Sequence, residues 1–172
     1  MMYRLGTAQD LAGLAEMAEQ AKAYFKAAGI DQWQHGEPSA QSLQAAIEAG
    51  RLYVLALEDG RPAAMITLAP GPEDSYEAVS GCWPDQKPYM AFHRVCVAPG
   101  FKGRGIAAQL FAASEALCRS LGYESVRIDT HPRNRSMQRA LEKSGYRFCG
   151  PLTLLSGTEK GGQRLGYHKS LA

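Results

Sequence analysis

The sequence lacks the features that mark several classes of protein. None of its four cysteines belongs to a Cys-x-x-C pair, and no spacing of His and Cys suits a zinc site. No stretch approaches the ~18 apolar residues that a membrane span needs. The opening segment, MMYRLGTAQD, shows neither the apolar run nor the cleavage pattern of a signal peptide. We therefore expect a cytoplasmic protein with reduced thiols, no bound metal and no contact with membranes.

The chain also has little excess of charge of either sign. The 19 Lys and Arg residues nearly balance the 17 Asp and Glu residues, which gives a net charge of +2 at pH 7. This value is too close to neutral to indicate binding to nucleic acid, so any anion must be bound by a local cluster of groups. Apolar residues make up 45% of the chain, a normal fraction for a folded protein. The 172 residues suffice for one well-packed domain, spanning 1–172, but are few for two.

Hydrophobic periodicity predicts a mixed α/β order of elements. Thr7 and Asp10 form a capping-box pattern before the first helix, and Ser39 or Ser42 caps the second. The later helices are expected at 106–121 and 134–144. The expected strands are 2–6, 51–57, 62–68, 90–97, 125–129, 146–150 and 164–170.

Two segments between these elements carry turn signals. Asp59-Gly60 joins two apolar runs and predicts a hairpin with a type I′ turn, because glycine readily adopts the positive φ that this turn needs. The segment 69–88 is rich in proline, glycine and acidic residues and is expected to be a long loop. Long ordered loops are often functional.

A glycine-rich segment between a strand and a helix suits the binding of an anion. Lys102-Gly103-Arg104-Gly105 follows the apolar strand that ends at Val97 and leads directly into a helix at Ile106. The first amides of a helix have no partner within it and lie at the positive end of its dipole. An anion can approach them where glycines carry no side chain, and the Lys and Arg add positive charge. The segment therefore suits a phosphate or pyrophosphate.

Two other interpretations fit this segment when it is taken alone. One is a glycine-rich turn with two solvated basic residues, a common arrangement. The other is a dinucleotide fingerprint, since Gly103-x-Gly105-x-x-Ala108 fits G-x-G-x-x-A and Asp129 lies near the expected distance of ~20 residues. Against the fingerprint, the strand ends several residues before the glycines, and a hairpin precedes the segment. A Walker loop is excluded because no Gly-Lys-Ser/Thr occurs.

The segment resembles motif A of the GNAT superfamily of acyl-CoA-dependent N-acyltransferases. In that motif an apolar strand and Val-x-Pro precede Arg/Gln-x-x-Gly-x-Gly/Ala. Here Lys102 stands at the Arg/Gln position, and Gly105 and Ala107 match. The stretch from Asn134 through a helix to Lys143-x-Gly145-Tyr146 is similar to motif B of the same superfamily. The two motifs cover residues 90–150, and their shared order is more specific than either motif alone.

The resemblance implies a GNAT-like mixed sheet of about six to seven strands, splayed between its fourth and fifth strands and flanked by about four helices. The pantetheine arm of acetyl-CoA enters this gap in the family. By that resemblance, the coenzyme pairs with the backbone of Val95, Cys96 and Val97. The amides of Lys102, Gly103, Arg104, Gly105, Ile106, Ala107 and Ala108 hold the pyrophosphate. Asn134, Met137 and Gln138 line the other side of the coenzyme.

The family's usual catalytic residues are missing from this sequence. The general-base Glu that the family often places on the fourth strand is replaced by Ala91, and the Tyr that often protonates the thiolate is replaced by Leu141. His93 lies two residues beyond Ala91 on the same strand face and suits proton transfer near neutral pH. We predict His93 as the base, with a hydrogen-bonded structural role as the equal alternative. Weaker candidates are Glu73, Glu77 and Tyr89.

Other side chains are candidates for contact with the acceptor. Arg94 suits bidentate contact with a carboxylate or, equally, bracing of the long loop. Trp33 and Trp83 are expected to line the acceptor pocket. Cys96 is not expected to act as a nucleophile, because a cysteine in the middle of a strand usually packs in the core.

The sequence thus predicts an enzyme that transfers an acetyl or other acyl group from acetyl-CoA to a primary amine. The amine belongs to a small molecule and attacks the thioester directly. A non-catalytic sensor of acyl-CoA is the alternative, motivated by the replacements at Ala91 and Leu141. A dinucleotide-binding oxidoreductase is a more distant one. The oligomeric state stays open, with a homodimer as one option.

Overall fold

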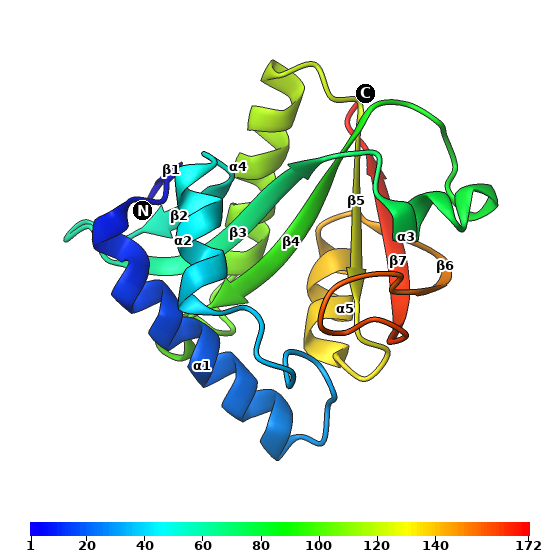
Figure 1. The fold of residues 1–172 in the computed structure, drawn as a ribbon. Coiled ribbons are helices and arrows are strands. Elements are labelled where there is room, and N and C mark those ends of the chain that lie inside the picture. Colours follow the sequence, from blue (N-terminus) through cyan, green and yellow to red (C-terminus); the bar gives the residue numbers. More distant parts are fainter.

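Seven strands form a single mixed sheet in the computed structural model, which describes residues 1–172 (Figure 1). Their order across the sheet is β1-β2-β3-β4-β5-β7-β6, and β4 and β5 are the only neighbours that run parallel. The chain passes from β4 to β5 through a helix, as a parallel pair requires. The strands are β1 (Met2–Leu5), β2 (Leu52–Ala56), β3 (Pro62–Pro70), β4 (Tyr89–Val97), β5 (Ser125–Thr130), β6 (Arg147–Thr153) and β7 (Gln163–Ser170).

Helices cover both faces of this sheet (Figure 1). α1 (Leu11–Ala27) and α2 (Ala40–Glu48) pack on one face, through a buried cluster that includes Leu14 and Leu43. α4 (Ile106–Ser120) and α5 (Arg135–Lys143) pack on the other, through a larger cluster that includes Phe111 and Leu141. A further helix, α3 (Asp74–Glu77), is a single turn. The predicted fold class, a mixed α/β sheet flanked by helices, is confirmed.

The capping signals in the sequence act where they were expected. The Asp10 carboxylate accepts a hydrogen bond from the Thr7 N–H at 2.8 Å before α1. Ser39, not Ser42, is the N-cap of α2, and its Oγ accepts from the Ser42 N–H at 3.1 Å. These bonds satisfy amide groups that the helices themselves leave without partners.

The hairpin between β2 and β3 forms at Asp59-Gly60, but its turn is not type I′. Such a turn needs positive φ at both central residues, and here Gly60 has it (+88°) while Asp59 does not. The Leu57 N–H donates to the Arg61 carbonyl at 2.9 Å, which closes a three-residue loop. Glycine in the last position of such a loop supplies the left-handed residue of a bulged hairpin.

The segment 69–88 is more ordered than a long loop. Its start continues β3 as far as Pro70, and its middle forms α3 and a short 3₁₀ turn, Ser80–Cys82. Tyr76 and Trp83 are buried here in a small core with Tyr89, and the Trp83 indole N–H donates to the Tyr76 carbonyl at 2.9 Å. Burial of these aromatic side chains orders a segment whose composition alone suggested a loop.

β4 and β5 separate part-way along their length. Their pairing runs from Tyr89 opposite Ser125 to Phe92 opposite Ile128 and then ends, although β4 continues to Val97. In the same place, the register between β3 and β4 shifts by one residue, and Arg94 adopts φ of +51°. This is a β-bulge, which bends a strand away from its neighbour. The sheet is therefore splayed between β4 and β5, as the resemblance implied.

Candidate active site

The loop between β4 and α4 presents a row of free amides. No backbone N–H from Gly103 to Ala108 donates a hydrogen bond within the protein. Gly103 and Gly105 have φ of +75° and +73°, and neither has an atom within 4 Å of where a Cβ would lie. Six consecutive amides are thus left without a partner at the positive end of a 15-residue helix. The site fits a phosphate or pyrophosphate group by its shape and its donors.

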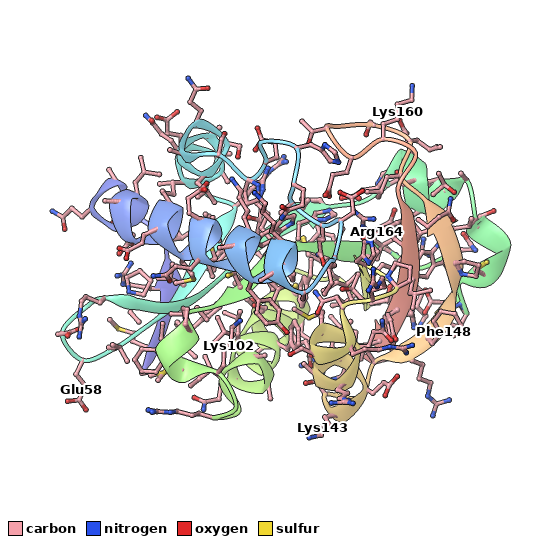
Figure 2. The ribbon with its side chains drawn as sticks, turned by 90° about the horizontal axis from the view of Figure 1, so that it is seen from below. Glu58, Lys102, Lys143, Phe148, Lys160 and Arg164 are labelled. Atoms are coloured by element: carbon pink, nitrogen blue, oxygen red, sulfur yellow. The ribbon has the colours of Figure 1, made fainter.

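The basic residues of this loop are exposed but differ in their contacts. The side chain of Lys102 (Figure 2) extends from the loop to α1, where its Nζ lies 4.2 Å from the centre of the Tyr24 ring. Arg104 lies 5.7 Å from the centre of the Phe101 ring. Because neither side chain forms an ion pair, their charges remain available to a bound anion.

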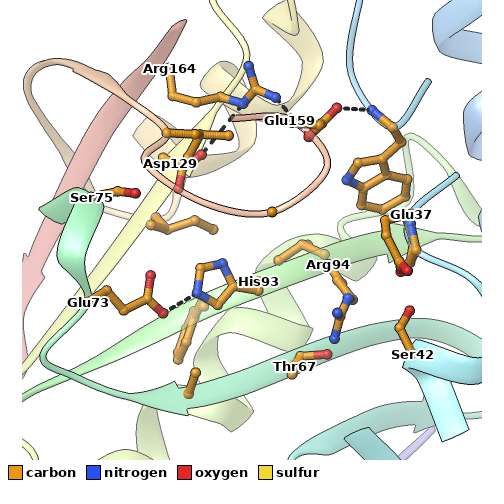
Figure 3. A pocket seen from close by; sticks show the side chains of 18 of the residues that line it. Glu37, Ser42, Thr67, Glu73, Ser75, His93, Arg94, Asp129, Glu159 and Arg164 are labelled. Carbon is orange, nitrogen blue, oxygen red and sulfur yellow. Dashed lines mark hydrogen bonds and ion pairs between the residues drawn. The ribbon is translucent and has the colours of Figure 1, made fainter. Parts of the chain in front are cut away.

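A cavity of about 660 Å³ lies where the two strands separate (Figure 3). Phe92 and Val95 line it from β4, Ile128 and Thr130 line it from β5, and Met137 lines it from α5. The loop between α1 and α2, segments of α2, β3 and α3, and the loop before β7 form most of the rest of its wall. The cavity therefore reaches from the gap between the parallel strands to the face covered by α2 and α3.

Glu73 and His93 form the central pair of this cavity. The Nε2 atom of His93 lies 2.5 Å from Oε1 of Glu73, and no hydrogen bond engages its Nδ1. The side chains are 33% and 25% exposed, so solvent and small molecules reach both. Burial opposes protonation of the imidazole, but the hydrogen bond and charge of Glu73, aided by Asp129, outweigh it and raise the pKa of His93. The pair can therefore hold and release a proton.

A chain of polar contacts continues from this pair along the cavity wall. The Tyr76 hydroxyl donates to Oδ2 of Asp129 at 2.7 Å, and its ring stacks against His93. Burial raises the pKa of the Asp129 carboxyl, and the nearby positive charge of His93 counteracts part of that effect. Arg164 lies 3.8 Å from Asp129 and donates to Glu159 at 2.9 Å. These contacts fix one wall of the cavity.

Arg94 lies on the bulge and faces into the same cavity (Figure 3). Its guanidinium forms no hydrogen bond or ion pair, so it does not brace the segment 69–88. Burial lowers its pKa, and the charge of Glu37 opposes that effect. Of the two uses considered for Arg94, the bracing one is absent from the structure.

The structure brings six of the residues considered for the site from the sequence to this cavity. They are Trp33, Glu73, His93, Arg94, Val95 and Met137. Trp33 joins the wall through its backbone N–H, which donates to Glu159 at 2.5 Å. Val95 precedes Cys96 and Val97 in the part of β4 that has no strand partner on the β5 side, so its backbone is open toward the gap.

Other expected residues lie outside the cavity wall. Trp83 is 5% exposed and packs among Tyr76, Tyr89 and Arg127, which keeps its indole out of an acceptor pocket. Asn134 caps α5, where its Oδ1 accepts from the Met137 N–H at 3.1 Å. Gln138 is buried and donates to the carbonyls of His131 and Pro132. The side chains of Asn134 and Gln138 thus shape the start of α5.

Three further positions on the family's motifs are buried and supply no catalytic group. Ala91 and Leu141 are fully buried, so the places of the two missing family residues are filled by core packing. Burial raises the pKa of the Cys96 thiol to about 12, and its Sγ faces the Met17 carbonyl. A thiol in such surroundings is a poor nucleophile.

Several cavity residues were not anticipated from the sequence. Asp129 was considered only as the end of a strand and as the acidic residue of the dinucleotide fingerprint, and Tyr76, Glu37, Glu159 and Arg164 carried no motif. Their positions depend on long-range contacts between α3, β5 and the loop before β7, which local patterns do not encode. Only Asp129 had a usable signal, since polar residues at the ends of parallel strands collect at one edge of the sheet.

Comparison with known proteins identifies the family to which the chain belongs. The family model for the acetyltransferase (GNAT) family matches residues 14–146. The chain belongs to this family. Members of the GNAT family take acetyl-CoA as their acyl donor, and the free amides and splayed strands described above fit that coenzyme. The same match argues against the dinucleotide-binding alternative.

Solved structures of GNAT proteins share the fold over nearly the whole chain. A GNAT acetyltransferase from Streptococcus agalactiae 2603 is 30% identical with a TM-score of 0.83, and the alignment covers 98% of this chain and 94% of that chain. One from Listeria monocytogenes 4b F2365 is 21% identical with a TM-score of 0.70 and the same coverage. A phosphinothricin acetyltransferase from Sinorhizobium meliloti, solved in complex with AcCoA, is 14% identical with a TM-score of 0.71, covering 99% and 88%. The last two show likeness of fold.

No curated protein matches the chain in sequence. None of the helices combines the length and apolar character needed to cross a membrane. No group of three or more His, Cys, Asp or Glu side chains is placed to hold a metal ion.

Proposed function

We propose that this GNAT-family protein transfers an acetyl group from acetyl-CoA to the primary amine of a small molecule. The observation that carries the proposal is the relation of three features along β4. The strand bears His93 inside the cavity, has an open edge beyond Phe92 and ends at the loop of free amides. One strand thus connects a place for the pyrophosphate with a group suited to proton transfer.

The coenzyme is proposed to bind along this strand. The amides of 103–108 hold the pyrophosphate, with Lys102 and Arg104 adding charge. The backbone of Val95, Cys96 and Val97 pairs with the pantetheine amides, in the place where β5 no longer pairs with β4. Met137 contacts the other side of the arm, whereas Asn134 and Gln138 act by holding the start of α5 in place.

His93 is proposed as the general base, with Glu73 as the residue that positions it. When bound, acetyl-CoA supplies an activated thioester carbonyl. Because Nε2 of His93 faces Glu73, Nδ1 is left to accept a proton from the incoming ammonium. The charges of Glu73 and Asp129 stabilise the imidazolium that results. The geometry follows the general pattern of a histidine base oriented by a carboxylate.

A non-catalytic acyl-CoA sensor is the second candidate, since Ala91 replaces the family's usual base and Leu141 its usual acid. Release of thiol from acetyl-CoA in the presence of a panel of amines separates the two functions. Mass spectrometry should find the acetylated amine if the protein is an enzyme. Binding of acetyl-CoA without release of thiol above the background rate, across the whole panel, would support the sensor.

A further inference from the structure

Arg94 is held in an unusual place by the backbone. It is one of only two non-glycine residues with positive φ, the other being Trp33, and both line the cavity. Positive φ is unfavourable for a side chain of this kind, so such residues persist where the surrounding structure imposes them. In Arg94 the bulge turns the side chain into the cavity, toward Thr67 and Ser42 (Figure 3).

The guanidinium of Arg94 is a half-buried cation of the cavity wall that has no partner, whereas Arg51, which also lines the cavity without a partner, is exposed. His93 is paired with Glu73, and Arg164 is paired with Glu159 and Asp129. Arg94 has five N–H donors and uses none of them. A half-buried arginine without partners is costly unless a ligand supplies them.

The carboxylate of Glu37 does not satisfy this arginine. Glu37 lies close enough to influence Arg94 electrostatically, yet no oxygen of Glu37 lies within 4.0 Å of the guanidinium. Its oxygens instead accept from the backbone N–H of Ser39 at 2.9 Å and from the Ser39 hydroxyl at 3.3 Å. Glu37 therefore lowers the local positive charge without occupying the donors of Arg94.

Thr67 provides a second, independent sign of a missing ligand. It lies on β3 opposite His93, lines the cavity and is 5% exposed. Its Oγ1 is buried and has no hydrogen-bond partner in the protein. Buried hydroxyls in folded proteins are nearly always bonded, so an unpartnered one at a cavity wall indicates a group that binds there.

We propose that Arg94 and Thr67 bind a carboxylate of the acceptor, which makes the acceptor a small amino-carboxylate. This inference rests on the proposed function. The carboxylate would lie against the guanidinium and the Thr67 hydroxyl, while the amine reaches His93, the neighbour of Arg94 along β4 and of Thr67 across the sheet. A carboxylate matches the fork of an arginine. A phosphate, with about −1.5 to −2 charges at pH 7, suits the vicinity of Glu37 less well.

The test compares matched acceptors that differ only in this group. Release of thiol from acetyl-CoA is measured with the twenty L-amino acids, β-alanine and 4-aminobutyrate, and with the carboxamide of each. The proteins are the wild type, Arg94→Asn, Arg94→Lys and Thr67→Val, with Arg61→Gln as control. Asn suits positive φ better than most residues, so the fold should tolerate it. Arg61 is an exposed arginine of the β2–β3 turn, outside the cavity wall.

We expect the wild type to prefer at least one carboxylate over its amide by more than about 30-fold in kcat/KM, mainly through KM. Arg94→Asn should reduce this preference to less than about threefold while leaving affinity for acetyl-CoA unchanged, and Arg94→Lys should restore part of it. Thr67→Val should weaken the preference by a smaller factor, and Arg61→Gln should not change it. Phosphate-bearing amines such as O-phosphoethanolamine are included and should be poorer acceptors than the carboxylates.

Different failures point to different parts of the account. Equal rates for acids and amides, a preference that survives Arg94→Asn, or a preference for the phosphate-bearing amine would overturn the inference and leave the acetyl transfer intact. Failure of every amino-carboxylate to react while acetyl-CoA still binds would also overturn it. Failure of acetyl-CoA itself to bind would instead overturn the proposed function.

Discussion

His93 Nε2 lies 2.5 Å from Glu73 Oε1, and this contact joins β4 to the segment that leads into α3. The two residues are 20 positions apart in the sequence. The contact has two consequences for the proposed chemistry: it fixes which imidazole nitrogen is free, and it shifts the pH at which that nitrogen can accept a proton.

The pH dependence of turnover should therefore respond to Glu73. A raised pKa of His93 means that its neutral form, the base, prevails only above a pH higher than its ordinary 6.5. In the wild type, kcat/KM should rise with pH through a midpoint above that value. Glu73→Gln removes the charge that raises the pKa and leaves burial, which lowers it, so the midpoint should move to lower pH. NMR titration of the His93 ring measures the same shift directly, and an unchanged or higher pKa in the variant would contradict the assignment.

Removal of the base should separate turnover from binding. His93→Ala should lower kcat by about 10²- to 10⁴-fold, the usual contribution of general acid–base catalysis, while the affinity for acetyl-CoA stays within a factor of two. His35→Ala is a suitable control, because His35 is 53% exposed and lies outside the cavity wall. Loss of coenzyme affinity in His93→Ala, or retention of full kcat, would remove His93 from the mechanism.

A buried carboxylate, Glu115, lies on the face of the sheet that α4 and α5 cover and contributes to the stability of the fold. Glu115 on α4 is 5% exposed, accepts from the Tyr146 hydroxyl at 2.9 Å and pairs with Lys169 at 2.7 Å. Lys169→Met leaves this charge without its cation and should lower the free energy of unfolding by about 2 kcal/mol, since Lys169 is partly exposed. Urea unfolding measures the change. A loss below about 0.5 kcal/mol would mean that solvent replaces the lysine.

The four cysteines should differ in reactivity. Burial raises the pKa of the Cys96 and Cys118 thiols to about 12, whereas Cys82 is exposed. Brief alkylation of the native protein with iodoacetamide, followed by mass spectrometry, should label Cys82 first and leave Cys96 and Cys118 unmodified until denaturant is added. Early labelling of Cys96 would show that the packing of β4 against α1 opens more readily than the structure implies.

Sequence patterns anticipated the features that depend on neighbouring residues. Gly103 and Gly105 indicated a loop with positive φ, because only local backbone freedom is needed there, and Ser39 predicted a cap because its partner is three residues away. Met137, singled out through the spacing of motif B, lines the cavity, and its contact with the coenzyme stays a prediction. Such features can be predicted without knowledge of the fold.

The features that were missed depend on contacts across the fold. Nothing in the local sequence marks Arg94 as a bulged residue, because the bulge is a property of its pairing with β3. Trp83 was expected at the acceptor pocket, but it packs with Tyr76 and Tyr89 in a small core. The closeness of Glu73 and His93 likewise arises only when β3 and β4 pair and α3 folds back.

The central claim is that acetyl-CoA binds with its pyrophosphate at the amides of 103–108. Isothermal titration of acetyl-CoA into Gly105→Asp tests it, because a carboxylate placed at this site repels the phosphates while Asp tolerates positive φ. Gly122→Asp is the matched control, since Gly122 also has positive φ and open space but follows the opposite end of α4. We predict at least 100-fold weaker binding for Gly105→Asp and near wild-type binding for Gly122→Asp. Equal affinity in the two variants would contradict the account.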